Sequence, residues 1–297
     1  MTPIKTILTW LAGMRANFLV LAVVLVMVGG GAARYTGTFH TGLFLMTVLG
    51  VVCAHISVNL FNEYYDWKTG IDARTERTPF SGGSGSLQKG LLRPAQVRAA
   101  AWLALTVAGC IGLLLARISG WPVLVLMVVG GFTIVFYTGF LARIMLGELA
   151  SGITLGSLVV IGTYYVQTGA INSMVIWASI PPGILTLLLL FLNEFPDVEA
   201  DRVGGRRHMV IALGKHNAAY VYAGLLMTVY FIIIGGVVLG DMPLSSLIGL
   251  ATFPLSVIVS FRTIRHFHNI QELIPALGMN VIIVLATDFL LALGFVL

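Results

Sequence analysis

A long apolar segment ends in the stretch Asn62-Glu63-Tyr64-Tyr65-Asp66-Trp67-Lys68-Thr69-Gly70-Ile71-Asp72, and the beginning of this stretch is repeated later in the chain. The second stretch lies 131 residues further on (193 − 62) and reads Asn193-Glu194-Phe195-Pro196-Asp197-Val198-Glu199-Ala200-Asp201. Each begins Asn-x3-Asp and then adds another Asp. Eight of the twelve acidic residues, among them Glu76, lie within or beside the two stretches. Because the rest of the chain is so apolar, this concentration of carboxylates indicates a functional site.

The composition is that of an integral membrane protein. Of the 297 residues, 58% are hydrophobic and 10% are charged, whereas a soluble domain carries roughly 25% charged residues. Apolar runs of about 20 residues are long enough to cross a hydrocarbon core of about 30 Å, and a helix satisfies its own backbone there. The predicted spans are 16–33, 41–61, 96–116, 121–141, 146–167, 174–195, 217–240, 244–261 and 277–297. We therefore predict an all-α bundle of nine transmembrane helices around a central cavity, with residues 1–297 forming a single domain.

The basic residues predict the orientation of this bundle. Fifteen of the 17 Lys and Arg residues fall at one end of the predicted spans, and only Arg34 and Arg117 fall at the other. By the positive-inside rule the amino terminus is cytoplasmic and, after nine crossings, the carboxyl terminus is outside. Both acidic stretches then face the cytoplasm of a prokaryotic inner or plasma membrane, where loops 62–95 and 196–216 form a cap. The net charge of +5 reflects this topology and gives no support for binding to nucleic acid.

The first stretch continues a predicted helix that has one polar face. The residues at helical spacing on this face are His55, Asn59, Asn62 and Asp66. Lipid does not solvate such a stripe, so it must face a cavity or another helix.

Gly70 predicts the end of this helix, because glycine favours a left-handed cap. Asp72 therefore lies outside the helical register of Asp66 and must fold back to share a site with it. The polar segment 74–94 that follows is too long for a simple helix connection of about 2–8 residues. Its glycines allow backbone N–H groups to approach a phosphate, and a flexible linker is an equally good interpretation.

The second stretch has helical spacing throughout. Asn193, Asp197 and Asp201 follow each other at intervals of four residues, which predicts one helical face with neighbours roughly 6 Å apart. Pro196 predicts a kink where this helix meets the cytoplasm.

The two stretches suit a site for divalent cations. Two sets of carboxylates on one membrane face repel each other unless positive charge lies between them. Their four Asp residues carry a charge of −4, which two Mg²⁺ ions would neutralise with oxygen ligands. The predicted metal ligands are Asn62, Asp66, Asp72, Asn193, Asp197 and Asp201. Nearby basic side chains exceed what a bare metal site needs and suit a diphosphate. These predicted diphosphate ligands are Arg77, Arg143, Arg206 and Lys215.

A diphosphate at the mouth of an apolar cavity implies a lipid tail that runs into the bundle. We therefore predict a polyprenyl diphosphate as substrate, with metal and basic groups stabilising the departing diphosphate. Asp66 and Asp197 are predicted to be catalytic in this step. The ring face of Tyr65, Tyr137, Tyr164 or Phe195 is predicted to stabilise the developing carbocation, with Tyr137 taken as catalytic. Glu148, also taken as catalytic, or a tyrosine is predicted to accept a proton, and a simple interaction of Glu148 with a helix dipole is the alternative.

Three residues are predicted to contact the molecule that accepts the prenyl group, which the family resemblance described below implies is aromatic. They are Arg15, Tyr164 and Tyr165. Snorkelling to lipid head groups is an equally good interpretation of Arg15. An aromatic belt at the membrane interface is the simpler interpretation of the two tyrosines.

One Asn-x3-Asp motif is a weak signal, but two copies on one face of a nine-span bundle resemble the UbiA superfamily of intramembrane prenyltransferases. This resemblance implies that both Asp-rich motifs bind Mg²⁺ and a prenyl diphosphate. The first motif reads Asn-x3-Asp-x5-Asp and is followed by a Gly-Gly-Ser stretch and by Gly90-Leu91-Leu92-Arg93-Pro94. These features are most similar to the menaquinone-pathway branch, which implies prenylation of 1,4-dihydroxy-2-naphthoate with loss of its carboxylate.

Other functions fit the sequence less well. The same chemistry would serve 4-hydroxybenzoate, homogentisate or a glycerophosphate lipid as acceptor. A cation-coupled secondary transporter also carries intramembrane acids, but its binding site tends toward the membrane midplane, whereas these acids lie near one face. A lipid-binding protein without catalytic activity would not need so many carboxylates around a phosphate.

Overall fold

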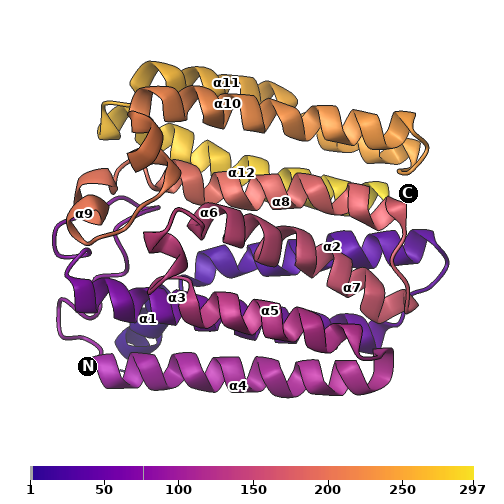
Figure 1. The fold of residues 1–297 in the computed structure, drawn as a ribbon, viewed down its shortest axis with the longest axis horizontal. Coiled ribbons are helices and arrows are strands. Elements are labelled where there is room, and N and C mark those ends of the chain that lie inside the picture. Colours follow the sequence, from indigo (N-terminus) through magenta and orange to yellow (C-terminus); the bar gives the residue numbers. More distant parts are fainter. Residues whose placement is uncertain (1–2, 76) are drawn as a thin grey trace.

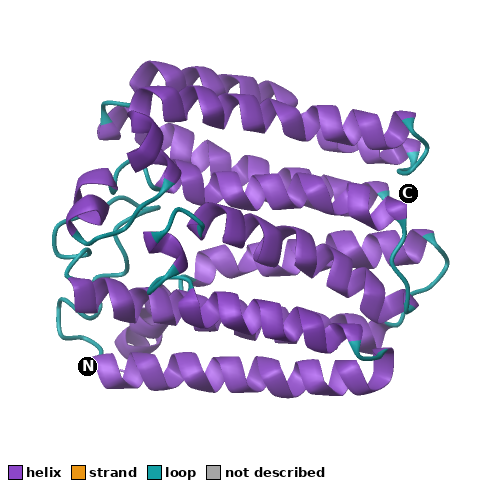
Figure 2. Ribbon diagram, viewed as in Figure 1, coloured by secondary structure: helices purple, strands orange, loops and turns teal. Residues whose placement is uncertain are grey.

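The computed structural model describes residues 3–75 and 77–297, and this part of the chain is helical and contains no strand (Figure 2). Glu76, one of the clustered acids, lies outside the described residues. The elements are α1 (Pro3–Gly13), η1 (Ala16–Phe18), α2 (Leu19–Tyr35), α3 (Thr41–Thr69), α4 (Pro94–Ser119), α5 (Pro122–Phe136), η2 (Leu141–Arg143), α6 (Gly147–Ala150), η3 (Ser151–Ser157), α7 (Leu158–Thr168), α8 (Ser173–Asn193), α9 (Val198–Val203), α10 (Met209–Val238), η4 (Leu244–Thr252), α11 (Phe253–His266) and α12 (Ile270–Gly294). The predicted all-α fold is confirmed.

Eight helical stretches among the described residues are long and apolar enough to cross a membrane. They overlap eight of the nine predicted spans. The predicted span 121–141 corresponds to α5, which is apolar but only 15 residues long. It ends early because residues 137–146 form a turn and the short helix η2 before α6 begins.

The long connections gather at one end of the bundle (Figure 1). Segments 70–75 and 77–93 lie there, and so does segment 194–208, which includes the short helix α9. The turns that join α2 to α3 and α4 to α5 lie at the opposite end. This alternation brings the carboxyl ends of α3 and α8, which carry the two acidic stretches, to the same end of the molecule.

Glycines let α2 approach two neighbouring helices closely. A Cβ at Gly29 would lie 2.4 Å from the carbonyl oxygen of Val160 on α7, and one at Gly31 would lie 2.7 Å from that of Ala292 on α12. Small residues at such contacts are typical of helix pairs in membranes, where close backbone approach replaces the hydrophobic effect as the driving force. Helix α2 therefore packs closely against both α7 and α12.

The helical stretch from α6 to α7 contains a π-helix, η3. Its Gly156 packs against α8 so closely that a Cβ would lie 2.6 Å from the Cα atom of Gly183. Ser151 and Thr154, also on η3, line the central cavity. Short π-helical turns occur frequently at functional sites, and this one brings two hydroxyl side chains to the cavity wall.

Candidate active site

The first acidic stretch follows its predicted helix to the end. Helix α3 continues to Thr69, and Gly70 caps it with a φ of 74° in the left-handed region, as predicted. His55, Asn59 and Asn62 line the central cavity. The polar stripe of α3 therefore faces a cavity and not lipid.

Asp72 folds back onto the site, as predicted. It is only 4% exposed, and the side-chain amide of Gln88 donates to its Oδ2 atom at 3.0 Å. Gly83 (φ 65°) packs so closely that a Cβ would lie 2.4 Å from the same oxygen. Burial, and then the carboxylate of Glu63, raises the pKa of Asp72. Asp72 also acts electrostatically on Asp66, so the two carboxylates belong to one site.

The glycine-rich segment 79–86 is packed against the rest of the site. Glu63 on α3 is fully buried, and its carboxylate accepts hydrogen bonds from the backbone N–H of Ser84 at 3.1 Å and from the Ser84 hydroxyl. Arg77 lies against the same segment, where a Cβ at Gly85 would overlap its guanidinium group. Glycine is therefore required at positions 83 and 85, because a Cβ there would overlap neighbouring side chains and because both residues have a left-handed backbone.

The second stretch differs from its prediction. Helix α8 ends at Asn193 and α9 begins five residues later, so Asn193, Asp197 and Asp201 do not share one continuous helical face. The predicted kink is a complete break, because Pro196 has no N–H for the helical ladder and its ring clashes with the carbonyl four residues earlier. A turn replaces the helix, and in it the N–H of Asp197 donates to the carbonyl of Glu194 at 3.2 Å.

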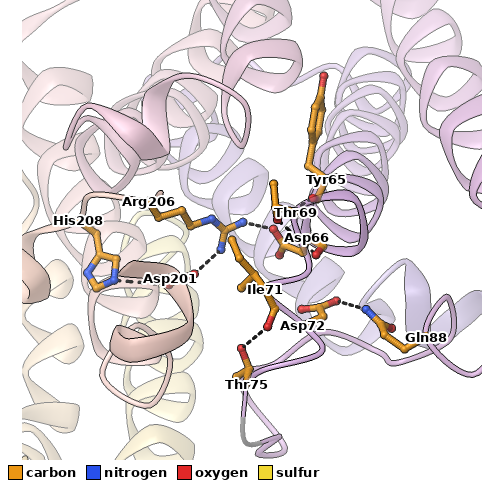
Figure 3. A network of polar contacts seen from close by, with 10 residues as sticks. All are labelled: Tyr65, Asp66, Thr69, Ile71, Asp72, Thr75, Gln88, Asp201, Arg206 and His208. Atoms are coloured by element: carbon orange, nitrogen blue, oxygen red, sulfur yellow. Dashed lines mark hydrogen bonds and ion pairs between the residues drawn. The ribbon is translucent and has the colours of Figure 1, made fainter. Parts of the chain in front are cut away.

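Arg206 joins the two stretches (Figure 3). One guanidinium nitrogen pairs with Asp66, and another donates to Asp201 Oδ1 at 3.1 Å. Burial alone would lower the pKa of Arg206, but the carboxylates of Asp66 and Asp201 raise it above its ordinary value. A permanently charged group from the loop after α9 thus lies between carboxylates of two different helices.

The network continues from Asp201 into a further group of buried side chains. His208 places Nε2 3.4 Å from Asp201 Oδ2 and Nδ1 3.5 Å from Glu194 Oε2. Ligand atoms of Glu148, Glu194 and His208 all lie within 4.8 Å of one another. Burial, and then the carboxylate of Glu148, raises the pKa of Glu194 well above its ordinary value. The Oε1 atom of Glu148 accepts a hydrogen bond from the backbone N–H of Met209 at 2.5 Å, so Glu148 caps the start of α10.

Sequence reasoning missed three members of this site, namely the buried Glu63 and His208 and the partly buried Glu194. The two glutamates directly follow Asn62 and Asn193, so the repeated Asn-Glu pair was an available signal. No comparable signal marked His208, because its contacts depend on the turn between α9 and α10.

The oxygens of the predicted metal ligands fit a divalent cation. Three of them are buried and accept no hydrogen bond from the described residues, namely Oδ1 of Asn62, Asn193 and Asp197. A buried acceptor without a partner costs about 1–3 kcal/mol. Burial, and then the carboxylate of Asp201, raises the pKa of Asp197 to about 7. Carboxylate and amide oxygens that accept no hydrogen bond are the kind of donor that Mg²⁺ prefers.

Asn62 and Asn193 line an apolar cavity of about 380 Å³ that extends into the bundle. Arg15, Asn62 and Asn193 lie at its mouth, the end next to the carboxylates. Leu115 and Val123 lie at the other end, beside the turn between α4 and α5. The cavity therefore offers a polar mouth and a long apolar interior.

Arg15 points into this cavity. Its backbone is left-handed (φ 52°) between α1 and η1, and its half-buried side chain lines the cavity. It acts electrostatically on Asp66, Asp72 and Asp197. Of the two interpretations of Arg15, the structure supports the inward one.

The other predicted residues near the mouth fall into two groups. Tyr137 lines the cavity, and the half-buried Lys215 interacts electrostatically with the carboxylates of Glu199 and Asp197. Arg77 and Arg143 are exposed, and within the described part of the chain no ion pair joins either of them to a predicted metal ligand.

The structure does not bring Tyr164 and Tyr165 to the carboxylates. The hydroxyl of Tyr164 accepts a hydrogen bond from the Asn172 side chain at 2.9 Å, and Tyr165 packs against the buried cluster of Leu115, Val123 and Val166. Sixteen residues of mostly helical chain, roughly 24 Å at about 1.5 Å per residue, separate Tyr164 from Glu148. Both tyrosines therefore lie at the end of the bundle that faces away from the site.

A helical membrane bundle with buried carboxylates and a buried guanidinium group at one end, next to an apolar cavity, is the architecture of an intramembrane enzyme for lipids with an anionic head. The chain belongs to the UbiA prenyltransferase family, whose sequence model matches residues 22–272. The protein is thus a prenyltransferase, and the resemblance drawn from the two acidic stretches is confirmed.

Two relatives act on naphthoate-type acceptors by name. The 1,4-dihydroxy-2-naphthoate octaprenyltransferase of Bacillus subtilis (strain 168) is 30% identical over 229 residues, which cover 76% of this chain and 72% of the relative. The 2-carboxy-1,4-naphthoquinone phytyltransferase of Synechocystis sp. (strain ATCC 27184 / PCC 6803 / Kazusa) is 28% identical over 269 residues, covering 89% and 84%.

Solved structures of the family share the fold. A UbiA homologue from Aeropyrum pernix K1 superposes with a TM-score of 0.72 at 18% identity, covering 94% of this chain and 96% of the other. A homologue from Archaeoglobus fulgidus, bound to DMAPP and Mg²⁺, superposes with a TM-score of 0.62 at 11% identity, covering 96% and 99%.

Proposed function

We propose that this protein transfers a polyprenyl group from an allylic diphosphate to 1,4-dihydroxy-2-naphthoate, with Mg²⁺ as cofactor. The observation that carries the proposal is that Arg206 joins both acidic stretches, whose first residues, Asn62 and Asn193, line an apolar cavity. The names of the Bacillus and Synechocystis relatives support a naphthoate acceptor. Membership of the prenyltransferase family argues against a cation-coupled transporter.

The six predicted ligands would hold two Mg²⁺ ions. The first set is Asn62, Asp66 and Asp72, and the second is Asn193, Asp197 and Asp201. The unpaired oxygens in both sets support this assignment, as does the Mg²⁺ bound to the Archaeoglobus homologue. When bound, the metal supplies positive charge that balances the carboxylates and the diphosphate.

Arg206 and Lys215 are the basic side chains that support diphosphate binding. The planar guanidinium of Arg206 suits bidentate contact with phosphate oxygens, and it lies between the two acidic stretches. Lys215 faces Asp197 of the second stretch. Both cations are therefore placed to stabilise the charge that gathers on the diphosphate as the C–O bond breaks.

The reaction breaks the allylic C–O bond, and the diphosphate leaves with the electron pair. An electron-rich ring carbon of the acceptor attacks the allylic carbon and forms the new C–C bond. With dihydroxynaphthoate, the carboxylate on that carbon leaves as CO₂, and its bonding electrons restore the aromatic ring. Tyr137 presents a ring to the developing cation near the mouth, and Arg15 pairs with the acceptor carboxylate.

This choice of acceptor limits the role of Glu148. Loss of CO₂ restores the ring without removal of a ring proton, and one carboxylate oxygen of Glu148 is engaged with the N–H of Met209. We expect Glu148 to accept a proton only with an acceptor that loses one from its ring, such as 4-hydroxybenzoate.

We place the protein in the plasma membrane of a prokaryote, with the mouth of the cavity toward the cytoplasm. The positive-inside distribution of Lys and Arg residues supports this orientation. The predicted cap, 62–95 and 196–216, is only partly loop, because residues 62–69 continue α3 and residues 209–216 begin α10. The connections after α3 and around α9 then form the cytoplasmic cap over the mouth, where water-soluble acceptors arrive.

Purified protein tests the proposal directly. Geranylgeranyl diphosphate and Mg²⁺ are supplied with dihydroxynaphthoate, 4-hydroxybenzoate, homogentisate or a glycerophosphate lipid in parallel reactions. We expect prenylated product and CO₂ with dihydroxynaphthoate, and no product when EDTA replaces Mg²⁺. Product with another acceptor alone would reassign the acceptor, and no product with any of them would overturn the enzyme assignment.

A further inference from the structure

Two polar side chains line the largely apolar interior of the cavity, His55 on α3 and Thr186 on α8. Each lies seven residues before the asparagine that begins an acidic stretch (62 − 55 and 193 − 186). Seven residues are about two helical turns, so each side chain shares a helix face with its asparagine and lies roughly 10 Å deeper in the bundle. We call His55 and Thr186 the inner polar pair.

The inner polar pair is buried without hydrogen-bond partners. His55 is 7% exposed and Thr186 is 3% exposed, and neither His55 Nδ1 nor Thr186 Oγ1 has a partner among the described residues. The other Ser and Thr side chains that line the cavity each donate to a carbonyl three or four residues earlier in the chain. These satisfied side chains are Thr47, Thr133, Ser151, Thr154 and Thr163. Because an unpaired buried polar atom is costly, the inner polar pair indicates that a polar group enters the cavity.

The donor does not supply this polar group. An isoprenoid tail has no hydrogen-bonding atom, and the polar end of the donor is the diphosphate, which the proposed metal ligands hold at the mouth. The group that reaches the inner polar pair therefore belongs to the acceptor. Hydroxyl groups suit this role, because each can both donate and accept a hydrogen bond.

The position of Arg15 relates the inner polar pair to the charge of the acceptor. Arg15 acts electrostatically on His55. One turn of α3 further on, the side-chain amide of Asn59 donates to the carbonyl of Met14, the residue before Arg15, at 2.9 Å. The cation proposed to hold the acceptor carboxylate is therefore close to an imidazole that can bond a hydroxyl beside that carboxylate.

Dihydroxynaphthoate has its hydroxyls where this arrangement needs them. One hydroxyl is on the ring carbon next to the carboxylate, and the other is on the opposite side of the same ring. The two hydroxyls therefore suit partners on two different helices that line one cavity, as His55 and Thr186 do.

We propose that the inner polar pair binds the two hydroxyl groups of the acceptor, His55 the one beside the carboxylate and Thr186 the one across the ring. This inference rests on the proposed function, because it takes the acceptor to be a 1,4-dihydroxy aromatic acid. A site built to bond a substrate hydroxyl rejects a compound that lacks it, since its own polar group is then left unpaired. 4-Hydroxybenzoate, with a single hydroxyl opposite its carboxylate, leaves at least one member of the pair without a partner.

An acceptor analogue tests the assignment in the unaltered protein. 1-Hydroxy-2-naphthoate lacks only the hydroxyl across the ring, and its inhibition constant against dihydroxynaphthoate is measured with excess geranylgeranyl diphosphate and Mg²⁺. In wild type we expect this constant to lie at least about tenfold above the KM for dihydroxynaphthoate, because the Thr186 hydroxyl is left unpaired. Equal values would overturn the role of Thr186.

Variants of the pair separate the two contacts. Thr186→Val should raise the KM for dihydroxynaphthoate by about tenfold, with the KM for the donor and the inhibition by 1-hydroxy-2-naphthoate unchanged. Thr186→Ser keeps the hydroxyl and should behave as wild type. His55→Phe should weaken the binding of both naphthoates by about tenfold, because both carry the hydroxyl beside the carboxylate. Thr133→Val is the matched control, since that hydroxyl lines the same cavity but already donates to the carbonyl of Val129 at 2.9 Å.

The outcomes distinguish this inference from the proposed function. Wild-type transfer to dihydroxynaphthoate with an unchanged KM in both Thr186→Val and His55→Phe would overturn the inference alone. An equal loss in Thr133→Val would do the same, because it would show a general disturbance of the cavity. Transfer by wild type to another acceptor only, or to none, would overturn the proposed function itself. Thermal unfolding of each variant confirms that it is folded.

Discussion

Arg206 pairs with Asp66, although 140 residues of chain separate them. The same guanidinium donates to Asp201, so one side chain links a carboxylate at the end of α3 to one on α9. Without this cation the two buried carboxylates would lose their counter-charge. The contact therefore ties the stability of the fold to the charge balance of the active site.

Replacing Arg206 with Ala should destabilise the metal-free protein by about 3–5 kcal/mol, because buried charge is left without a partner. Added Mg²⁺ should raise the unfolding temperature of this variant more than that of wild type, since it restores the missing positive charge. Thermal unfolding in detergent, with EDTA and with Mg²⁺, measures both effects. Arg202→Ala is the control, because that side chain is 58% exposed and pairs with an exposed Glu199. Equal stability of both variants in EDTA would contradict the bridging role.

Asp66→Ala and Asp197→Ala should each lower Mg²⁺-dependent transfer by more than about 100-fold, since even residues that only orient a metal ligand contribute about 10–100-fold. Both proteins should remain folded, as judged by gel filtration and circular dichroism. Glu199→Gln provides the comparison, because its carboxylate lies on α9 between the proposed ligands but is 79% exposed. Full activity of the two Asp variants would refute the metal site.

Gly83→Ala should raise the Mg²⁺ concentration needed for half-maximal activity by about tenfold. The reason is that its Cβ would lie 2.4 Å from Asp72 Oδ2 and would displace that carboxylate. Gly90→Ala separates this effect from backbone strain. The two glycines have nearly the same φ, 65° and 63°, but a Cβ at Gly90 would meet no atom within 4 Å. Titration of activity with Mg²⁺ measures the difference, and an equal shift in both variants would show that strain alone is responsible.

Glu148→Gln should affect the two acceptor classes differently. Transfer to 4-hydroxybenzoate, if it occurs, should fall by about 100-fold or more because a general base is lost. Transfer to dihydroxynaphthoate should fall much less, since the amide oxygen can still accept the N–H of Met209. Glu148→Ala removes this cap as well and should cost about 1–2 kcal/mol of stability. An equal loss with both acceptors in the Gln variant would assign Glu148 a role in the shared ionisation step.

The features that depend on local sequence could be predicted. The polar stripe of α3, the cap at Gly70 and the return of Asp72 follow from helical periodicity and from glycine conformation, and the structure contains all three. The sequence predicts only a kink at Pro196, whereas the structure has a complete break between α8 and α9. A proline shows where the helical hydrogen bonds are interrupted, but not whether the next helix continues along the same axis.

The features that depend on tertiary contacts could not be predicted. Glu148 and Glu194 meet only because α6 packs beside the end of α8, and His208 joins them through the turn before α10. Tyr164 and Tyr165 are of a residue type that is common in binding sites. The length of helical chain between them and Glu148 nevertheless places them at the opposite end of the bundle. Residue type alone does not reveal depth along a helix.

The polar end of the cavity also separates the diphosphate from the prenylated product. The freed diphosphate leaves from the mouth, beside Arg15 and Asn62, where water is available. The prenyl chain, now bonded to the ring, no longer carries the diphosphate by which the donor was held at the mouth. What remains are apolar contacts with the cavity walls, and these offer little advantage over contacts with lipid tails. The step that forms the product therefore also removes its anchor, so that release into the bilayer follows from the chemistry itself.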